Sequence, residues 1–255
     1  MRVFLAATSQ GMSSKDREET FKKQKPLFVL ETFFNGEKLC DRALNLVGNN
    51  NFLLDSGAFS YMNGKEITKQ ELDVFVDKYI SYIKSRDIKY YMEMDVDVIF
   101  GIKQVEKWRH KIEISTGKKC IPVWHLNRGI EYWKKMCNEY NYVAIGGLVT
   151  GMKKQNYPLI KKMINYANSK GVKVHGLGFT KTKILREFKF YSVDSSSWSL
   201  SAVRGNQIHH FKDGVIEQRQ IDKKDKINYK TNGSLLASHN MKEWIKYQIY
   251  MIGVK

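Results

Sequence analysis

The sequence predicts an α/β fold, a (β/α)₈ barrel, from two observations. Short apolar runs rich in β-forming residues alternate with segments of helical periodicity over residues 1–200, and such alternation is typical of parallel sheets. Polar or glycine residues follow six of the apolar runs. Closure into a barrel explains this placement, since barrel active sites form at the carboxyl ends of strands. The alternative, an open doubly wound sheet, is expected to carry a GxGxxG loop, which ATSQGMSS after the first strand lacks.

Eight segments are predicted to be strands because they are short, apolar and bounded by turn-forming or polar residues. They are 3–7, 27–31, 52–55, 89–94, 120–124, 142–146, 172–176 and 190–194.

The predicted helices lie between most of these strands. Thr68 and Glu71 form a capping box before residues whose apolar side chains repeat at helical spacing. Pro158 stands at a first-turn position and Gly171 at a helix end. The helices are predicted over 69–84, 102–115, 129–139, 158–170 and 181–187.

The alternation stops after residue 200, so one domain over 1–255 is predicted, with a barrel core at 1–200 and an extension at 201–255. Residues 204–232 indicate a basic hairpin, and apolar residues from Met241 onward predict a final helix that packs on the barrel. The charged segment 9–26 is predicted to be irregular.

Composition favours a folded protein outside the membrane. Of the 255 residues 42% are hydrophobic, and no apolar stretch approaches the ~18–20 residues of a membrane span. MRVFLAATSQ has no convincing secretory signal, so we expect a cytoplasmic protein. Cys40, Cys120 and Cys137 form no CxxC pair, so neither a zinc site, a disulfide framework nor a cofactor is expected.

The net charge of +17 makes a nucleic acid a candidate partner. An alternative cause is a lysine-rich proteome. The basic residues expected to hold the polymer are Arg204, Lys223, Lys224, Lys226 and Lys230.

Aspartates follow several predicted strands. Asp55 and Asp194 would put two carboxylates on one rim, which suits chemistry with a nucleophile and a proton carrier. Either aspartate could instead cap a helix or turn. Asp95 and Asp97 lie two residues apart, so on a strand both face one side; a salt-bridged pair is the alternative.

Small residues and histidines accompany these carboxylates. Ser56 and Gly57 let the backbone approach a ligand closely, and Gly146 and Gly147 can admit a flat ring or form a tight turn. A lone histidine, such as His125 or His175, is a proton carrier, a stacking surface or a satisfied core residue.

Together these segments resemble the tRNA-guanine transglycosylase superfamily, whose members exchange bases in nucleic acids. DSGAF, MEMDVD, AIGGL, HGLG and the aspartate of YSVDSSSW occur in the order of that family's motifs across residues 50–200. The resemblance implies that Asp194 is the nucleophile and Asp55 the general acid/base. It implies that Asp95, or Asp97, reads the base. The other base-binding positions that it implies are Ser56, Gly57, His125, Gly146, Gly147, His175 and Gly176. In this comparison His175 takes the place of a methionine that covers the ring, and the amides of Gly146 and Gly147 read the base carbonyl.

The chain departs from the tRNA enzymes in lacking their CxCxxC-plus-histidine zinc site, and DSSSW with Arg204 is similar to the phage and bacterial branch that modifies DNA. We therefore expect replacement of guanine in DNA by a free 7-deazaguanine (preQ0-type) base. If the chain is phage-encoded, the resemblance implies that it acts in the host cytoplasm. The tRNA reaction and a catalytically inactive nucleic-acid-binding barrel are the alternatives.

Overall fold

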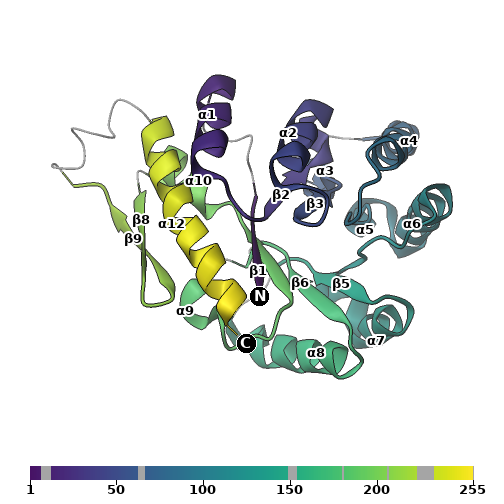
Figure 1. Ribbon diagram of the computed structural model, residues 1–255. Coiled ribbons are helices and arrows are strands. Elements are labelled where there is room, and N and C mark those ends of the chain that lie inside the picture. The colour runs from purple at the N-terminus through teal and green to yellow at the C-terminus, as the bar shows by residue number, and fades with distance from the viewer. Residues whose placement is uncertain are drawn as a thin grey trace.

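The computed structural model describes residues 1–6, 13–62, 67–148, 154–179, 181–205, 207–222 and 233–254 (Figure 1). Its main sheet has seven parallel strands in the order β3-β2-β1-β7-β6-β5-β4. The strands are β1 (Arg2–Leu5), β2 (Val29–Thr32), β3 (Phe52–Asp55), β4 (Val123–Trp124), β5 (Tyr142–Ile145), β6 (Lys173–Gly176) and β7 (Ser192–Ser195).

An eighth extended segment, residues 90–93, joins the two edge strands of this sheet. The Leu54 N–H donates to the Tyr90 carbonyl at 3.0 Å, and the Ile121 N–H donates to the Tyr91 carbonyl at 2.8 Å. The segment pairs through isolated parallel bridges on both sides, so it replaces the regular strand predicted at 89–94. The ring of backbone contacts is therefore continuous, and the predicted barrel-like α/β fold is confirmed.

Helices surround the sheet, as Figure 1 shows. The capping box is present: Glu71 accepts the Thr68 N–H at 2.8 Å, and Thr68 Oγ1 accepts the Glu71 N–H at 3.2 Å. The helices are α1 (Ser14–Gln24), α2 (Glu37–Val47), α3 (Ala58–Met62), α4 (Lys69–Ser85), α5 (Asp97–Phe100), α6 (Ile102–Thr116), α7 (Gly129–Glu139), α8 (Tyr157–Ser169), α9 (Thr182–Leu185), α10 (Ser197–Gly205) and α12 (Gly233–Gly253). Short 3₁₀ turns occupy Phe33–Asn35, Leu126–Arg128 and Lys154–Asn156.

Helix α1 corrects the prediction of an irregular segment at 9–26. Its inward positions are Arg17, Thr20 and Phe21, and all three are buried. Because two of these residues are polar, the helix has no apolar stripe that periodicity could reveal.

Two apolar layers build the core. Alternate side chains of the strands fill the barrel interior, and the others pack against the helices, as expected when parallel strands are covered on both faces. The interior layer contains Phe4, Ala6, Phe28, Leu30, Leu53, Met92, Ile121, Val123, Tyr142 and Ala144.

The C-terminal region forms the predicted hairpin and helix. Strands β8 (Gln207–Lys212) and β9 (Val215–Gln220) pair antiparallel. Helix α12 packs beside β1, where Gln248 donates to the carbonyls of Val3 at 2.7 Å and Phe28 at 2.9 Å.

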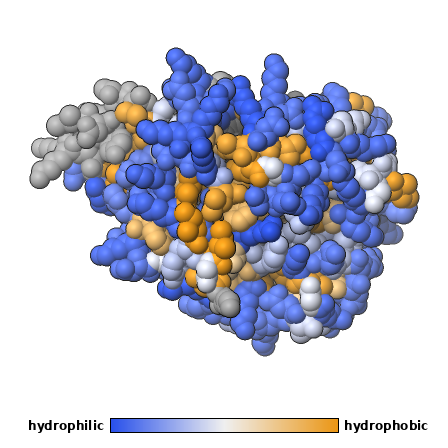
Figure 2. All heavy atoms as spheres, viewed as in Figure 1, coloured by the Kyte–Doolittle hydropathy of each residue, from blue (hydrophilic) through white to orange (hydrophobic). Residues whose placement is uncertain are grey.

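The visible face is mostly hydrophilic, with apolar side chains gathered over α12 (Figure 2). Ile249 and Ile252 of this helix are more than half exposed. Within the described ranges, no helix combines the length and the apolar character that crossing a membrane demands.

Candidate active site

Three carboxylates converge at the carboxyl ends of the barrel strands. Asp55 is the last residue of β3, Asp194 lies in β7, and Asp95 directly follows the segment 90–93. The negative charges of Asp95 and Asp194 both act on Asp55. The structure therefore brings together the three aspartates that the sequence placed on one rim.

Asp55 is held by one oxygen. Its Oδ2 accepts hydrogen bonds from Thr32 Oγ1 at 3.1 Å and from the Gly57 N–H at 3.2 Å, while Oδ1 has no partner among the described residues. Burial, followed by the charge of Asp95, raises the pKa of Asp55 to about 7. A carboxyl group with this pKa can carry a proton in either direction at neutral pH.

The small residues after Asp55 have structural roles. Gly57 has φ +90°, and a Cβ there would lie 2.4 Å from Phe34 Cβ and 2.9 Å from Thr32 Cγ2. Ser56 is fully buried, and its Oγ accepts the Ala58 N–H at 3.4 Å. The expected base contact therefore does not come from the Ser56 side chain, and Gly57 serves the close packing that positions Asp55.

Asp194 is likewise held by one oxygen. Oδ1 accepts the Gly178 N–H at 2.7 Å and lies 3.1 Å from His175 Nε2, while Oδ2 has no hydrogen bond to the part of the chain described. His175 is fully buried. The expectation that it covers a bound ring is therefore wrong, because its imidazole lies inside the barrel against Asp194.

Gly176 does not face the barrel mouth either. A Cβ at this position would lie 2.9 Å from Phe190 Cζ, in the core between barrel and helices. The expected base contact of Gly176 is corrected accordingly, because the residues of β6 alternate between the two layers.

His125 pairs with Asp95, with Nε2 at 2.7 Å from Oδ2. Burial alone would lower the pKa of His125, but the hydrogen bond and the charge of Asp95 raise it above its ordinary value. His125 therefore holds the base-reading candidate Asp95 by one oxygen.

The glycine pair lies against the same histidine. A Cβ on Gly146 would stand 2.4 Å from His125 Cε1. The Gly146 N–H already donates to the Trp124 carbonyl at 2.8 Å, so it cannot read a base carbonyl as expected. Gly147, with φ +71°, donates no hydrogen bond within the described ranges, and its amide alone keeps that predicted role.

Asp97 is separated from Asp95. The chain leaves the extended conformation after residue 93, and Asp97 begins α5. Its carboxylate contacts Arg128 Nη2 at 2.7 Å and Asn127 Nδ2 at 2.9 Å. Burial would raise the pKa of Asp97, but Arg128 and Asn127 bring it below its usual value. The salt-bridge alternative is correct for Asp97, which leaves Asp95 as the candidate for the base-reading role that the resemblance implies.

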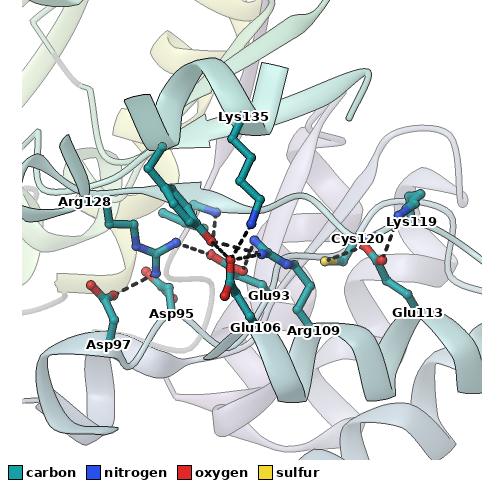
Figure 3. Close-up of polar contacts among 12 residues, drawn as sticks. Glu93, Asp95, Asp97, Glu106, Arg109, Glu113, Lys119, Cys120, Arg128 and Lys135 are labelled. Carbon is teal, nitrogen blue, oxygen red and sulfur yellow. Dashed lines mark hydrogen bonds and ion pairs between the residues drawn. The ribbon is translucent and has the colours of Figure 1, made fainter. Parts of the chain in front are cut away.

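A buried ion network supports this side of the site (Figure 3). Glu93 is fully buried and accepts from Arg128 at 2.7 Å, from Arg109 at 3.1 Å and from the Val123 N–H at 2.8 Å. Sequence reasoning missed Glu93, because a charged residue between two apolar ones is typical of a strand face exposed to solvent. The network fixes the segment that carries Asp95.

All five side chains predicted to contact the polymer lie outside the described part of the structure. They are those of Arg204, Lys223, Lys224, Lys226 and Lys230. Among the described residues, a groove of about 780 Å³ lies between α9 and the hairpin formed by β8 and β9. Its lining includes Lys183, Lys212, Phe211 and Arg219.

The cysteines do not gather. Cys40, Cys120 and Cys137 are all buried, and burial raises the pKa of each thiol. In the portion of the chain that the structure describes, no group of three or more His, Cys, Asp or Glu side chains could hold a metal ion.

Comparison with models of protein families and with curated protein sequences gives no match. Two solved structures are similar. A candidate fructose-1,6-bisphosphate aldolase from Coccidioides immitis has a TM-score of 0.56 at 12% identity, over 99% of this chain and 89% of that one. The carboxyl transferase domain of Rhizobium etli pyruvate carboxylase has a TM-score of 0.50 at 13% identity, over 97% of this chain and 47% of that one. At such low identity this likeness establishes the TIM-barrel-like fold alone.

Proposed function

We propose that this chain is a base-exchange transglycosylase that replaces guanine in DNA with a 7-deazaguanine (preQ0-type) base through a covalent aspartyl-glycosyl intermediate. The proposal depends most on the mouth carboxylates. Asp55 and Asp194 are each anchored through one oxygen, and the pKa of Asp55 is raised to about 7. One ionised carboxylate beside one proton-carrying carboxyl is what displacement at an anomeric carbon with retention requires.

In the first half-reaction, Asp194 Oδ2 forms a bond to C1′ while the C1′–N9 bond to guanine breaks. Asp55 in its acid form gives its proton to the departing base, which leaves neutral. The products are guanine and a glycosyl ester of Asp194. The raised pKa of Asp55 supports this role, because a substantial fraction of the group is protonated near pH 7.

The second half-reaction reverses these movements with the new base. Asp55, now ionised, takes the N9 proton of the 7-deazaguanine, and N9 forms the bond to C1′. The C1′–Oδ2 bond breaks, and its electron pair returns to the Asp194 carboxylate. The exchange involves no net oxidation, so the reaction needs no redox partner.

Base recognition is assigned to Asp95. A carboxylate accepts hydrogen bonds only, and the guanine edge presents two N–H groups to such an acceptor. His125 engages Oδ2 of Asp95, so Oδ1 stays available. Guanine and 7-deazaguanines share this edge, so one pocket can release the first and admit the second. The target nucleotide must leave the helical stack to reach Asp194.

Two features favour a nucleic-acid substrate. The net charge of +17 attracts a phosphate backbone. The groove with Lys183 and Lys212 borders α9, which follows β6. We propose DNA rather than tRNA as the substrate for two reasons. The DSSSW segment resembles the DNA-modifying branch, and the sequence lacks the zinc-ligand motif of the tRNA enzymes.

The rival functions fit the site less well. An aldolase that forms a Schiff base needs a lysine at the mouth, and none of the described barrel strands ends in lysine at its carboxyl end. A catalytically inactive nucleic-acid-binding barrel would have no use for Asp55, whose ionisation beside Asp95 and Asp194 is unfavourable.

The decisive experiment incubates the protein with DNA, or with unmodified tRNA, and labelled guanine or 7-deazaguanine. Wild-type protein is expected to incorporate label and to form a protein–nucleic acid adduct that survives denaturation. Asp194→Asn is expected to do neither, because an amide is a far weaker nucleophile. Asp213→Asn is the matched control, since Asp213 is exposed in the hairpin turn and has φ 49°, which asparagine tolerates. Wild-type turnover by Asp194→Asn would exclude the nucleophile assignment.

A further inference from the structure

A line of hydrogen bonds runs through the barrel interior to Asp194. Tyr142 Oη lies 2.6 Å from Ser192 Oγ, Ser192 Oγ lies 2.6 Å from His175 Nδ1, and His175 Nε2 lies 3.1 Å from Asp194 Oδ1. The residues come from the neighbouring strands β5, β6 and β7, where His175 pairs with Ser192 in register. All four residues are buried.

The proton positions along this line follow from what each group can donate. Tyr142 has Ser192 as its only hydrogen-bond partner in the described ranges, so its hydrogen is satisfied only if it donates to Ser192 Oγ. Burial raises the pKa of Tyr142, which keeps that hydrogen in place. Ser192 then donates to Nδ1 of His175, and the remaining imidazole hydrogen lies on Nε2 and points at Asp194. The opposite direction would leave the Tyr142 hydrogen buried without an acceptor, which is costly.

Packing also holds the imidazole. The Phe4 ring lies edge-on to His175, with ring centroids 6.0 Å apart and planes at 66°. Phe4 pairs with Asp194 in the strand register, so the same neighbour adjoins both residues. Any rotation of the imidazole would break its hydrogen bonds with Ser192 and Asp194 together.

Two N–H groups, those of His175 and Gly178, therefore meet Oδ1 of Asp194, and no described residue donates to Oδ2. We propose that His175 is a positioning residue that binds Asp194 through Oδ1 and presents Oδ2 to the anomeric carbon. This inference rests on the proposed function and adds which oxygen reacts and what directs it. The directional line from Tyr142 through Ser192 determines the tautomer that makes this possible.

The same hydrogen bond acts in both half-reactions. When Oδ2 bonds to C1′, Oδ1 becomes the carbonyl oxygen of the ester, and it still accepts from His175 and Gly178. When the incoming N9 displaces Oδ2, negative charge returns to both oxygens, and the two donors stabilise the departing carboxylate. Removal of the His175 donor should therefore lower the rate of exchange more than it weakens substrate binding.

The first test is spectroscopic and needs no substrate. Nitrogen-15 NMR of the histidine side chains, with His175 assigned by comparison with His175→Gln, should show an imidazole that carries its hydrogen on Nε2 and none on Nδ1. In Ser192→Ala, which removes the donor to Nδ1, the Nδ1 signal should move toward that of a nitrogen without a hydrogen-bond donor. A wild-type His175 protonated on Nδ1 alone would overturn the proposal.

The second test is kinetic. His175→Ala is expected to lower kcat on the order of 100-fold, the size expected when a reacting group is misplaced by about 1 Å, with KM for the nucleic acid within about twofold of wild type. His175→Gln keeps an N–H donor near the Nε2 position and should recover part of kcat. His110→Gln, on the exposed face of α6, is the matched control and should equal wild type. Wild-type kcat in His175→Ala, checked by thermal melting to be folded, would overturn the proposal.

The two tests separate this inference from the proposed function. Absence of exchange by wild-type protein on DNA and on tRNA, together with the Nε2 proton signal, would reject the transglycosylase and support the anchoring of Asp194 Oδ1. Exchange by wild-type protein that the His175 variants leave unchanged would retain the transglycosylase and reject the positioning role.

Discussion

Asp55 links the stability of the protein to its proposed activity. Its pKa is about 7 in the folded protein against an ordinary value of 3.8. Between these two pH values the folded chain holds a proton that the unfolded chain has released. The free energy of unfolding therefore decreases as pH rises through this range, and above pH 7 the unfavourable contribution is complete.

Asp55→Asn is expected to abolish exchange and to stabilise the protein at pH 8. The pKa shift corresponds to roughly 2–4 kcal/mol, reduced from the full value because the side chain is half-buried. Urea unfolding of both proteins at pH 3.5 and pH 8 measures the difference, which should be near zero at the lower pH. Asp213→Asn is the control. A stability difference that is the same at both pH values would show that folding does not raise the pKa of Asp55.

Gly146 is the second residue whose replacement is informative. Gly146→Ala would drive a methyl group into His125, because the Cβ would lie 2.4 Å from Cε1. We expect the hydrogen bond between His125 and Asp95 to break and free 7-deazaguanine to bind about 1–3 kcal/mol more weakly, measured by calorimetry. Gly253→Ala, with open space around its Cβ position, is the control. Unchanged affinity in Gly146→Ala would separate His125 from base recognition.

Residue roles could be predicted where strand alternation continues and not where it ends. Asp55 and Asp194 lie in regular strands, so their position at the rim followed from the pattern. Asp97 did not, because the chain turns after residue 93 and begins a helix. The core-residue alternative for His175 was correct, but its contact with Asp194 could not be predicted, because no sequence pattern shows how deep in the barrel a strand residue lies.

At the scale of elements, the segment 90–93 depends on side chains outside the strands to hold its position in the barrel. It pairs with its neighbours through isolated bridges only, and Glu93 ties it to α6 through Arg109 and to the Leu126–Arg128 turn through Arg128. Removing one partner of a buried ion pair leaves an uncompensated charge.

Glu93→Gln is therefore expected to destabilise the protein by about 3–5 kcal/mol. Glu131→Gln breaks only the exposed pair with Lys134 and should cost about 0–1 kcal/mol. Urea unfolding midpoints of the two variants provide the comparison. Equal midpoints would mean that backbone pairing alone holds the segment 90–93.

Helices could be predicted from the sequence where the residues they bury are large and apolar. The capping box and apolar spacing located α4 to within one residue. Helix α2 was missed because its fully buried positions are the small residues Cys40 and Ala43, and α1 was missed because it buries Arg17 and Thr20. In both, tertiary contacts outweigh the periodic signal.

At the scale of the whole molecule, the proposed function requires that a polymer reach the barrel mouth, and the charge of +17 and the location of basic groups suggest where it would bind. Lys183 and Lys212 are exposed in the groove between α9 and the hairpin. Removing one lysine that neutralises a phosphate should reduce the slope of log affinity against log salt by about 0.9 for duplex DNA. Charge attracts either polymer, so affinity alone does not identify the substrate.

Product analysis does identify it. Equal amounts of duplex DNA and unmodified tRNA, offered together with labelled 7-deazaguanine, should yield label in DNA. Label in tRNA and never in DNA would reject the DNA preference and leave the roles of Asp55 and Asp194 intact.

The groove is tested with the double variant Lys183→Ala/Lys212→Ala. This variant should bind DNA with a salt slope lower by up to about 2. Its kcat at saturating DNA should stay near wild type, because neither lysine touches the mouth carboxylates. Lys134→Ala/Lys170→Ala, at exposed positions on α7 and after α8, is the matched control for charge removal. An unchanged slope in the groove variant would place the polymer on another face of the barrel.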